Sequence, residues 1–193
     1  MLPDLLQVVS QVAQALETLG IPYLVGGSVA SSRYGVPRMT QDADLVVDLR
    51  LHHVEALVHA LQDTFYVDPG PIRDAIRLKS CFNIIHSTAI YKIDMFVIAS
   101  GAWARQEMQR RRLERAGIHE ELEFYFSSPE DIILHKLHWY RSGGGVSERQ
   151  WNDVLGVLKV QATELEYDYL DHWAAELGLT DLLVAALQEA NIP

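Results

Sequence analysis

Two aspartates, Asp42 and Asp44, stand two residues apart in a segment where apolar and polar residues alternate. This alternation is typical of a β-strand with one buried face, and it places both carboxylates on the other face, roughly 6 to 7 Å apart along the chain. Mg²⁺ prefers one or two carboxylates together with phosphate oxygens and water, and such a pair can supply them. The segment therefore predicts a metal site that works on phosphate groups.

A third carboxylate, Asp94, lies inside the apolar segment 91–96. Residues 81–98 contain two stretches rich in Ile, Val, Phe and Tyr on either side of a polar turn, which predicts a hairpin whose second strand carries Asp94. An acid within such a strand needs a reason, and a carboxylate on a neighbouring strand would complete a two-metal site. We expect Asp42, Asp44 and Asp94 to be metal ligands and catalytic residues.

Two glycines and a serine, Gly26, Gly27 and Ser28, separate a predicted strand at 21–25 from a predicted helix at 28–34. Glycines let the backbone approach a phosphate, and the N-terminus of a helix presents N–H groups and a favourable dipole. The serine could add a hydroxyl donor. Taken alone, the three residues are more typical of a plain turn with a helix cap than of a phosphate site.

The remaining elements predict an α+β fold with a mixed or antiparallel sheet flanked by helices. Apolar residues at helical spacing predict a first helix that ends at Gly20, and residues 52–62 predict another. Ser128 and Pro129 form a cap and first turn typical of a helix start, and Ser147 is a second cap candidate. We expect a core over residues 1–125 and a helical region over 126–193, with about four helices.

The bulk properties are those of one globular domain, or of one domain with a small appendage. The chain has 193 residues, about half of them apolar. Neither a secretion signal nor a membrane-spanning run of apolar residues is recognisable, so we expect a cytoplasmic protein with no membrane partner. Cys81 is the only cysteine, and its apolar surroundings predict a place in the core.

The formal charge of −10 argues against a protein that coats long nucleic acids, since these require clustered Lys and Arg. The charge is unevenly spread, however. Five arginines fall within residues 105–115, whereas residues 160–193 hold seven Asp or Glu and no Lys or Arg. The arginines could contact RNA phosphates, or they could form an ordinary solvated face.

Together, the motifs resemble the signature of the polymerase-beta-like nucleotidyltransferase superfamily. In that signature an apolar residue and a Gly-[Gly or Ser] pair precede a helix-length spacer and an Asp-x-[Asp or Glu] pair. Here the first part stands as Val25 to Ser28, and after a spacer of thirteen residues the second stands as Asp42 to Leu45. The expected third carboxylate follows at Asp94.

The resemblance implies an enzyme that transfers a nucleoside monophosphate from a nucleoside triphosphate to an acceptor, with magnesium or manganese as cofactor. In such an enzyme Asp42 and Asp44 bind the metal ions that bridge the triphosphate. Asp94 holds the metal nearest the acceptor and helps to deprotonate its hydroxyl. Gly26, Gly27 and Ser28 cradle the phosphates.

The helical region contains Lys136, Arg149 and Asp153, which resemble later motifs of AbiEii-like nucleotidyltransferases, a group that includes MenT-type toxins. The resemblance implies that Lys136 contacts the triphosphate, while Arg149 and Asp153 position the nucleotide or the lysine. The alternative is an exposed lysine and a surface ion pair between residues four apart.

Three interpretations of the function remain open at this stage. The chain could modify an RNA end, such as that of a tRNA, or a protein, possibly as a toxin with an antitoxin partner. It could instead modify a small molecule, as aminoglycoside nucleotidyltransferases do, and an acidic surface suits polycationic acceptors. A non-catalytic nucleotide-binding protein is the third interpretation, and the three carboxylates argue against it.

Overall fold

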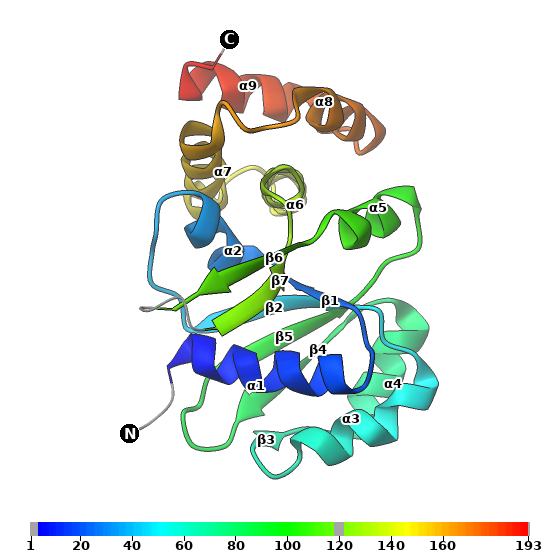
Figure 1. The fold of residues 1–193 in the computed structure, drawn as a ribbon. Coiled ribbons are helices and arrows are strands. Elements are labelled where there is room, and N and C mark those ends of the chain that lie inside the picture. The colour runs from blue at the N-terminus through cyan, green and yellow to red at the C-terminus, as the bar shows by residue number, and fades with distance from the viewer. Residues whose placement is uncertain (1–3, 118–121, 193) are drawn as a thin grey trace. The chain divides into compact units, whose positions relative to one another are not determined.

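The computed structural model describes residues 4–117 and 122–192, which form two compact units (Figure 1). The first unit comprises the chain up to Gly26 together with Thr40–Phe126. The second comprises Gly27–Met39 and the chain from Ser127 onward. The domain boundary expected between residues 125 and 126 stays a prediction, and residues 27–39 group with the C-terminal helices.

The first unit contains a mixed sheet and the helices packed on it. Its strands are β1 (Tyr23–Val25), β2 (Asp42–Val47), β3 (Phe65–Tyr66), β4 (Cys81–His86), β5 (Lys92–Val97), β6 (Arg112–Ala116) and β7 (Leu122–Phe126). Its helices are α1 (Leu5–Thr18), η1 (Leu51–His53), α3 (Val54–Leu61), α4 (Pro69–Leu78) and α5 (Ala102–Arg110). The second unit contains α2 (Gly27–Tyr34), α6 (Pro129–Ser142), α7 (Glu148–Gln161), α8 (Tyr167–Glu176) and α9 (Thr180–Ala190).

The strands described form one sheet in the order β3-β4-β5-β2-β1-β7-β6. The pairs β2–β5 and β1–β7 are parallel, and the other pairs are antiparallel. The predicted α+β fold with a mixed sheet is therefore confirmed, as is the hairpin of β4 and β5.

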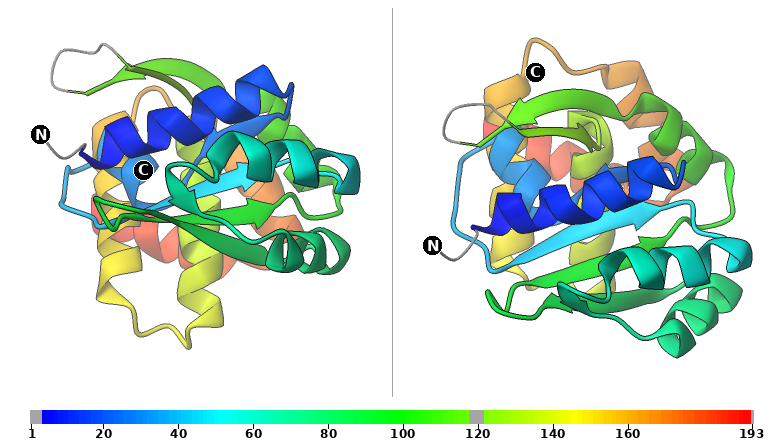
Figure 2. Two further views of the ribbon diagram at one scale, coloured as in Figure 1. Left: turned by 90° about the horizontal axis from the view of Figure 1, so that it is seen from below. Right: turned by 60° about the horizontal axis from the view of Figure 1, so that its bottom comes forward.

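One face of the sheet is buried under helices. Along β2 the buried residues are Ala43, Leu45 and Val47, and the register places them beside Ile93, Met95 and Val97 of β5. Helix α1 packs on β2 and β7, α4 packs on β4 and β5, and α3 lies beside α1 (Figure 2). Since side chains alternate along a strand, the other face carries the polar residues of β2 and β5.

Local sequence signals explain where these helices begin. Asp4 and Gln7 form a reciprocal capping box at the start of α1. The side chain of Ser128 accepts a hydrogen bond from the Asp131 N–H at the start of α6, where Pro129 occupies the first helical position. Helix α4 begins in the same way at Asp68, although the sequence analysis had not predicted it.

In the second unit α2 packs on α6 and α7. Helix α8 packs on α6, and α9 packs on α7. The chain leaves α2 so close to α7 that Gly35 has no room for a side chain. A Cβ atom at this position would stand 2.8 Å from the Val157 nitrogen and 2.9 Å from the Gly156 carbonyl carbon. The four helices described after residue 127 agree with the predicted helical region.

The prediction for Cys81 was wrong, because this residue is exposed. It stands first in β4, where Phe82 and Ile84 take the buried positions and Cys81 and Asn83 face solvent. Among the residues that the structure describes, no helix is both long and apolar enough to cross a bilayer.

We predict that Gly35→Ala destabilises the second unit by about 1–3 kcal/mol, because the added methyl group meets backbone atoms that cannot rotate away. Urea unfolding monitored by circular dichroism measures the change. Gly70→Ala is the matched control, since its Cβ would approach only side-chain atoms of Asp68. Equal stability of the two variants would contradict this account of the contact between Gly35 and α7.

Candidate active site

The polar face of β2 and β5 brings the three predicted acids together. In the parallel register Asp44 lies directly opposite Asp94, and Asp42 lies opposite Lys92. Neighbouring strands are about 5 Å apart, and residues in register on parallel strands point to the same side of the sheet. All three carboxylates therefore stand on one face within two rungs of the sheet.

A lysine that the sequence analysis had overlooked lies among these acids. The Lys92 Nζ atom is 2.7 Å from Asp94 Oδ2. Its hydrogen bond to Asp94 raises the pKa of Lys92, despite some desolvation, and the charges of Asp94, Asp42 and Asp44 act in the same direction. The ammonium group thus partly neutralises the acidic face.

The donor chemistry of this face suits a divalent cation. The acids are half-buried, and the Thr40 hydroxyl donates to Asp42 Oδ1 at 2.7 Å. Two carboxylates, completed by phosphate oxygens and water, are the usual Mg²⁺ ligands. As the described side chains stand, no group of three His, Cys, Asp or Glu is arranged to hold a metal ion. The assignment of Asp42, Asp44 and Asp94 as metal ligands stays a prediction.

The glycine turn begins beside Asp44. The Gly26 N–H donates to the Asp44 carbonyl oxygen at 2.8 Å, which fixes the end of β1 against β2. Gly27 follows with φ of +54°, a left-handed conformation that favours glycine. Gly27 is therefore the position of this turn whose backbone conformation favours glycine.

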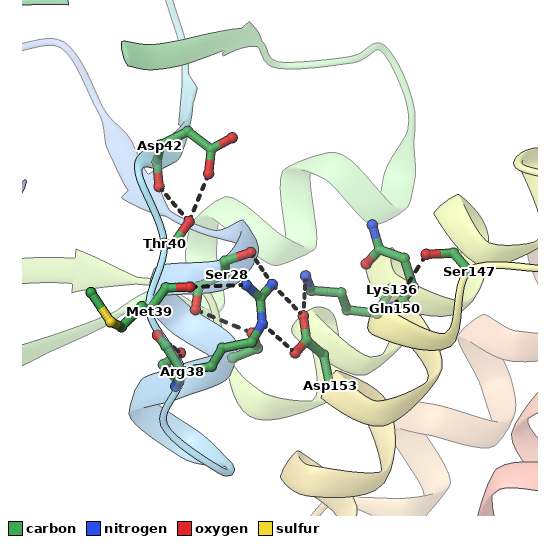
Figure 3. A network of polar contacts seen from close by, with 11 residues as sticks. Ser28, Arg38, Met39, Thr40, Asp42, Lys136, Ser147, Gln150 and Asp153 are labelled. Carbon is green, nitrogen blue, oxygen red and sulfur yellow. Dashed lines mark hydrogen bonds and ion pairs between the residues drawn. The ribbon is translucent and has the colours of Figure 1, made fainter. Parts of the chain in front are cut away.

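In the second unit a buried carboxylate, Asp153, binds two cations (Figure 3). Arg38 donates two hydrogen bonds to this carboxylate, from Nε to Oδ1 at 2.9 Å and from Nη2 to Oδ2 at 3.0 Å. Lys136 Nζ donates to Oδ2 at 2.8 Å. Arg38 also donates to the hydroxyl oxygen of Ser28 near the start of α2. We refer to Ser28, Arg38, Lys136 and Asp153 as the Arg38 cluster.

Burial alone would raise the pKa of Asp153, but the hydrogen bonds from Arg38 and Lys136 together outweigh it and lower the pKa. Lys136 and Asp153 are 5% and 7% exposed, so the pair is shielded from water. With two cations and one carboxylate, the Arg38 cluster has a formal charge of +1. A surplus of positive charge beside a hydroxyl group suits an anion such as phosphate.

The structure separates the predicted residues of the helical region. Lys136 and Asp153 are partners, as expected if the aspartate positions the lysine. Arg149, one turn before Asp153 on α7, is exposed, and the aspartate pairs instead with Arg38 and Lys136. The roles of all three in nucleotide binding stay predictions.

Arg38 is a candidate functional residue that the sequence analysis missed. It lies in the segment between α2 and β2, and 115 positions separate it from Asp153. No periodic pattern marks such a residue. Its position inside the spacer between the two halves of the resemblance was the available signal.

The five arginines at 105–115 lie around α5 and β6. Arg111 stacks over the Tyr125 ring at 4.7 Å, and Arg115 pairs with Glu123 at 3.1 Å. Both are thus engaged by neighbours in the first unit, and contact of the five arginines with RNA phosphates stays a prediction.

Three solved structures resemble the chain over nearly its full length. The solution structure of the antibiotic-resistance factor ANT(2'')-Ia has a TM-score of 0.57 at 15% identity and covers 96% of both chains. The crystal structure of ANT(2'')-Ia with adenylyl-2''-tobramycin has a TM-score of 0.58 at 15% identity, covering 89% of this chain and 95% of the other. An antigenic nucleotidyltransferase-like protein from Paracoccidioides brasiliensis has a TM-score of 0.56 at 17% identity, covering 96% and 92%.

The chain has the nucleotidyltransferase fold. No family model matches it, and no curated protein is similar to it in sequence. The observed fold agrees with the resemblance in fold alone, and the closer similarity to AbiEii-like proteins stays a prediction.

We predict that Asp153→Asn lowers the free energy of unfolding by about 3–5 kcal/mol at pH 7, because Lys136 is left buried without its counter-ion. The pKa of Asp153 is below its ordinary value of 3.8, so the stability it contributes is present above that value. This contribution is lost as the pH falls through the lower folded pKa. The difference between the wild type and Asp153→Asn should therefore shrink below pH 3.8 in urea unfolding.

A difference that stays constant from pH 7 to pH 3 would contradict the assigned charge of Asp153. Asp168→Asn, at an exposed acid in the first turn of α8, is the control and should remain close to the wild type at every pH.

Proposed function

We propose that the chain is a metal-dependent nucleotidyltransferase that moves a nucleoside monophosphate from a nucleoside triphosphate to an acceptor hydroxyl. The observation that supports this most directly is the register of β2 and β5, which pairs Asp44 with Asp94 on the polar face of the sheet. The fold agrees with the proposal, since two similar structures come from the resistance factor ANT(2'')-Ia.

In the proposed reaction the acceptor oxygen attacks the α-phosphorus of the triphosphate. The bond from that phosphorus to the bridging oxygen breaks, and pyrophosphate leaves. Asp94 takes the acceptor proton, since a carboxylate on this face can act as a general base. Magnesium or manganese, held by Asp42, Asp44 and Asp94, would neutralise the charge that develops on the phosphate oxygens.

Lys92 has a part in this proposal as the resident counter-ion of Asp94. Its ammonium contacts one carboxylate oxygen of Asp94 at 2.7 Å. A carboxylate that binds a metal must give up or share that contact, so Lys92 competes with the metal for Asp94. The positive charge of Lys92 also reduces the repulsion between the three carboxylates on this face.

The Arg38 cluster would contact the phosphates of the nucleotide. The side chain of Arg38 is 26% exposed, whereas the side chain of Lys136 is 6% exposed. Arg38 is therefore the more accessible cation, and Asp153 holds it in place. The Ser28 hydroxyl accepts from Arg38 and retains its own proton to donate to a phosphate oxygen. Gly26 and Gly27 would let the backbone come near the phosphates.

Three finer predictions belong to this proposal. They are a role for Arg149 in positioning the nucleotide, a place in the cytoplasm, and a toxin-like activity with an antitoxin partner. Incubating the protein with each labelled triphosphate and candidate acceptors, followed by mass spectrometry, tests the reaction. A mass increase equal to one nucleoside monophosphate on an acceptor is the expected result.

We predict that Asp44→Asn reduces nucleotide transfer by roughly 10²-fold or more, because losing a metal ligand removes several kcal/mol of transition-state stabilisation. The melting temperature should change little, since Asp44 does not face the buried core. Asp48→Asn is the control, because this acid follows the same strand and pairs with Arg50. A normally folded Asp44→Asn protein with the wild-type rate would refute the proposed mechanism.

We also predict that Arg38→Ala weakens the binding of a non-hydrolysable triphosphate by about 1.5–3 kcal/mol, the usual range for a hydrogen bond to a charged group. Lys136→Ala should weaken triphosphate binding as well, because Asp153 then attracts Arg38 without competition from Lys136. Isothermal titration calorimetry measures both affinities. The control is Arg33→Ala, an exposed arginine in the last turn of α2. Wild-type affinity in Arg38→Ala would remove the Arg38 cluster from the nucleotide site.

A further inference from the structure

The first unit has a hollow at the edge of the sheet where β3 ends. Strand β3 is two residues long and pairs only with Ile85 and His86 of β4. None of the described strands therefore pairs with the start of β4, from Cys81 to Ile84, on that edge. The space has a volume of about 780 Å³, which is within the usual range of small-molecule sites. Its lining residues are Gln62, Phe65, Tyr66, Val67, Asp68, Pro71, Cys81, Phe82, Asn83 and Ile85.

This hollow adjoins the acidic face along two rungs of the sheet. Asn83 lies directly opposite Asp94, and Ile85 lies opposite Lys92. Residues paired in this way have Cβ atoms about 5 Å apart and point to the same face. A molecule in contact with Asn83 is therefore a near neighbour of Asp94, the residue to which the proposed function gives the acceptor proton.

The lining combines apolar surface with a few polar groups. Phe65 and Phe82 are buried, and the Tyr66 ring is 68% exposed. Asn83 and Gln62 carry amides that can both donate and accept hydrogen bonds. Asp68 supplies the one formal charge of the lining, and its Oδ1 atom accepts the Gly70 N–H at 2.7 Å.

The charge of this lining discriminates between the acceptor classes. An RNA acceptor brings phosphates, which proteins neutralise with Lys or Arg. The ten lining residues include neither, and their one charge is negative. A carboxylate beside an exposed aromatic ring suits an amine instead, through an ion pair and a cation–π contact. The side-chain amides of Asn83 and Gln62 can form hydrogen bonds with hydroxyl groups of the acceptor.

We propose that this hollow binds the acceptor, and that the acceptor is a small molecule carrying both amine and hydroxyl groups. The inference rests on the proposed function. The amine is held by Asp68 and Tyr66, and Asn83 directs a hydroxyl toward Asp94. Cys81 lines the same space, so its reactivity reports on whether the hollow is filled.

The chain's single cysteine makes this test possible without engineering. A disulfide reagent such as DTNB modifies Cys81, which is exposed, and the rate is read from absorbance. Tobramycin serves as the probe because it carries several amines and hydroxyls. We expect a saturating concentration to slow the modification at least fivefold, and a short single-stranded RNA to leave the rate unchanged.

Asp68→Asn should abolish most of the protection by tobramycin while keeping the helix cap, since Asn is an equally good N-cap residue. The matched control is Asp63→Asn, an exposed acid near the hollow that is not part of its lining. Protection by RNA in place of tobramycin would overturn the inference. So would the absence of protection by tobramycin, or undiminished protection in Asp68→Asn.

A second measurement separates this inference from the proposed function. Coupling a bulky maleimide to Cys81 should reduce transfer to the acceptor at least tenfold, yet leave the affinity for a non-hydrolysable triphosphate unchanged. The transfer rate of Cys81→Ser should be the same before and after treatment with the maleimide. Transfer at the unmodified rate would overturn the inference and leave the proposed function intact. If no acceptor receives a nucleotide, the proposed function fails, and the protection of Cys81 still decides what the hollow binds.

Discussion

The parallel pairing of β2 with β5 is the constraint on which the rest of the first unit depends. A slip of one residue would turn Asp94 toward α4 and expose Met95 or Ile93 in its place. The apolar residues of both strands, packed under α1 and α4, prevent this slip. The core thus fixes the register, and the register brings Asp44 beside Asp94. Apolar packing on one face of the sheet thus positions the carboxylates on the other face.

The second unit positions its charges by a different means. Asp153 is almost fully buried, and burial of a lone carboxylate would be very unfavourable. Two cations share it, so the side chains of Arg38 and Lys136 lose their freedom to point elsewhere. A buried ion pair of this kind contributes little net stability, but its geometry is well defined. Precise placement of a guanidinium group is what recognition of a phosphate requires.

The sequence predicted those features that local pattern determines. Alternation identified the strand of Asp42 and Asp44, and the apolar surroundings of Asp94 marked it as a candidate. The prediction for Cys81 was wrong, because alternation does not say which face of a strand is buried. Arg38 was missed since its partner is 115 positions away. Helix α4 was missed although Asp68 gives the same start signal as Ser128, a signal that had been applied to only one of the two.

The second unit is discontinuous in the chain, and this has a consequence for its synthesis. Residues 27–39 emerge from the ribosome long before α6 and α7, the helices on which α2 packs. From Met39 to the end of α7 at Gln161 is about 120 residues, which takes roughly 6 to 24 s at about 5–20 residues per second. During that interval α2 has no partner in its own unit. The eight residues of α2 are too few for a stable isolated helix, so this segment remains a nascent chain without its packing partners until α6 and α7 have been synthesised.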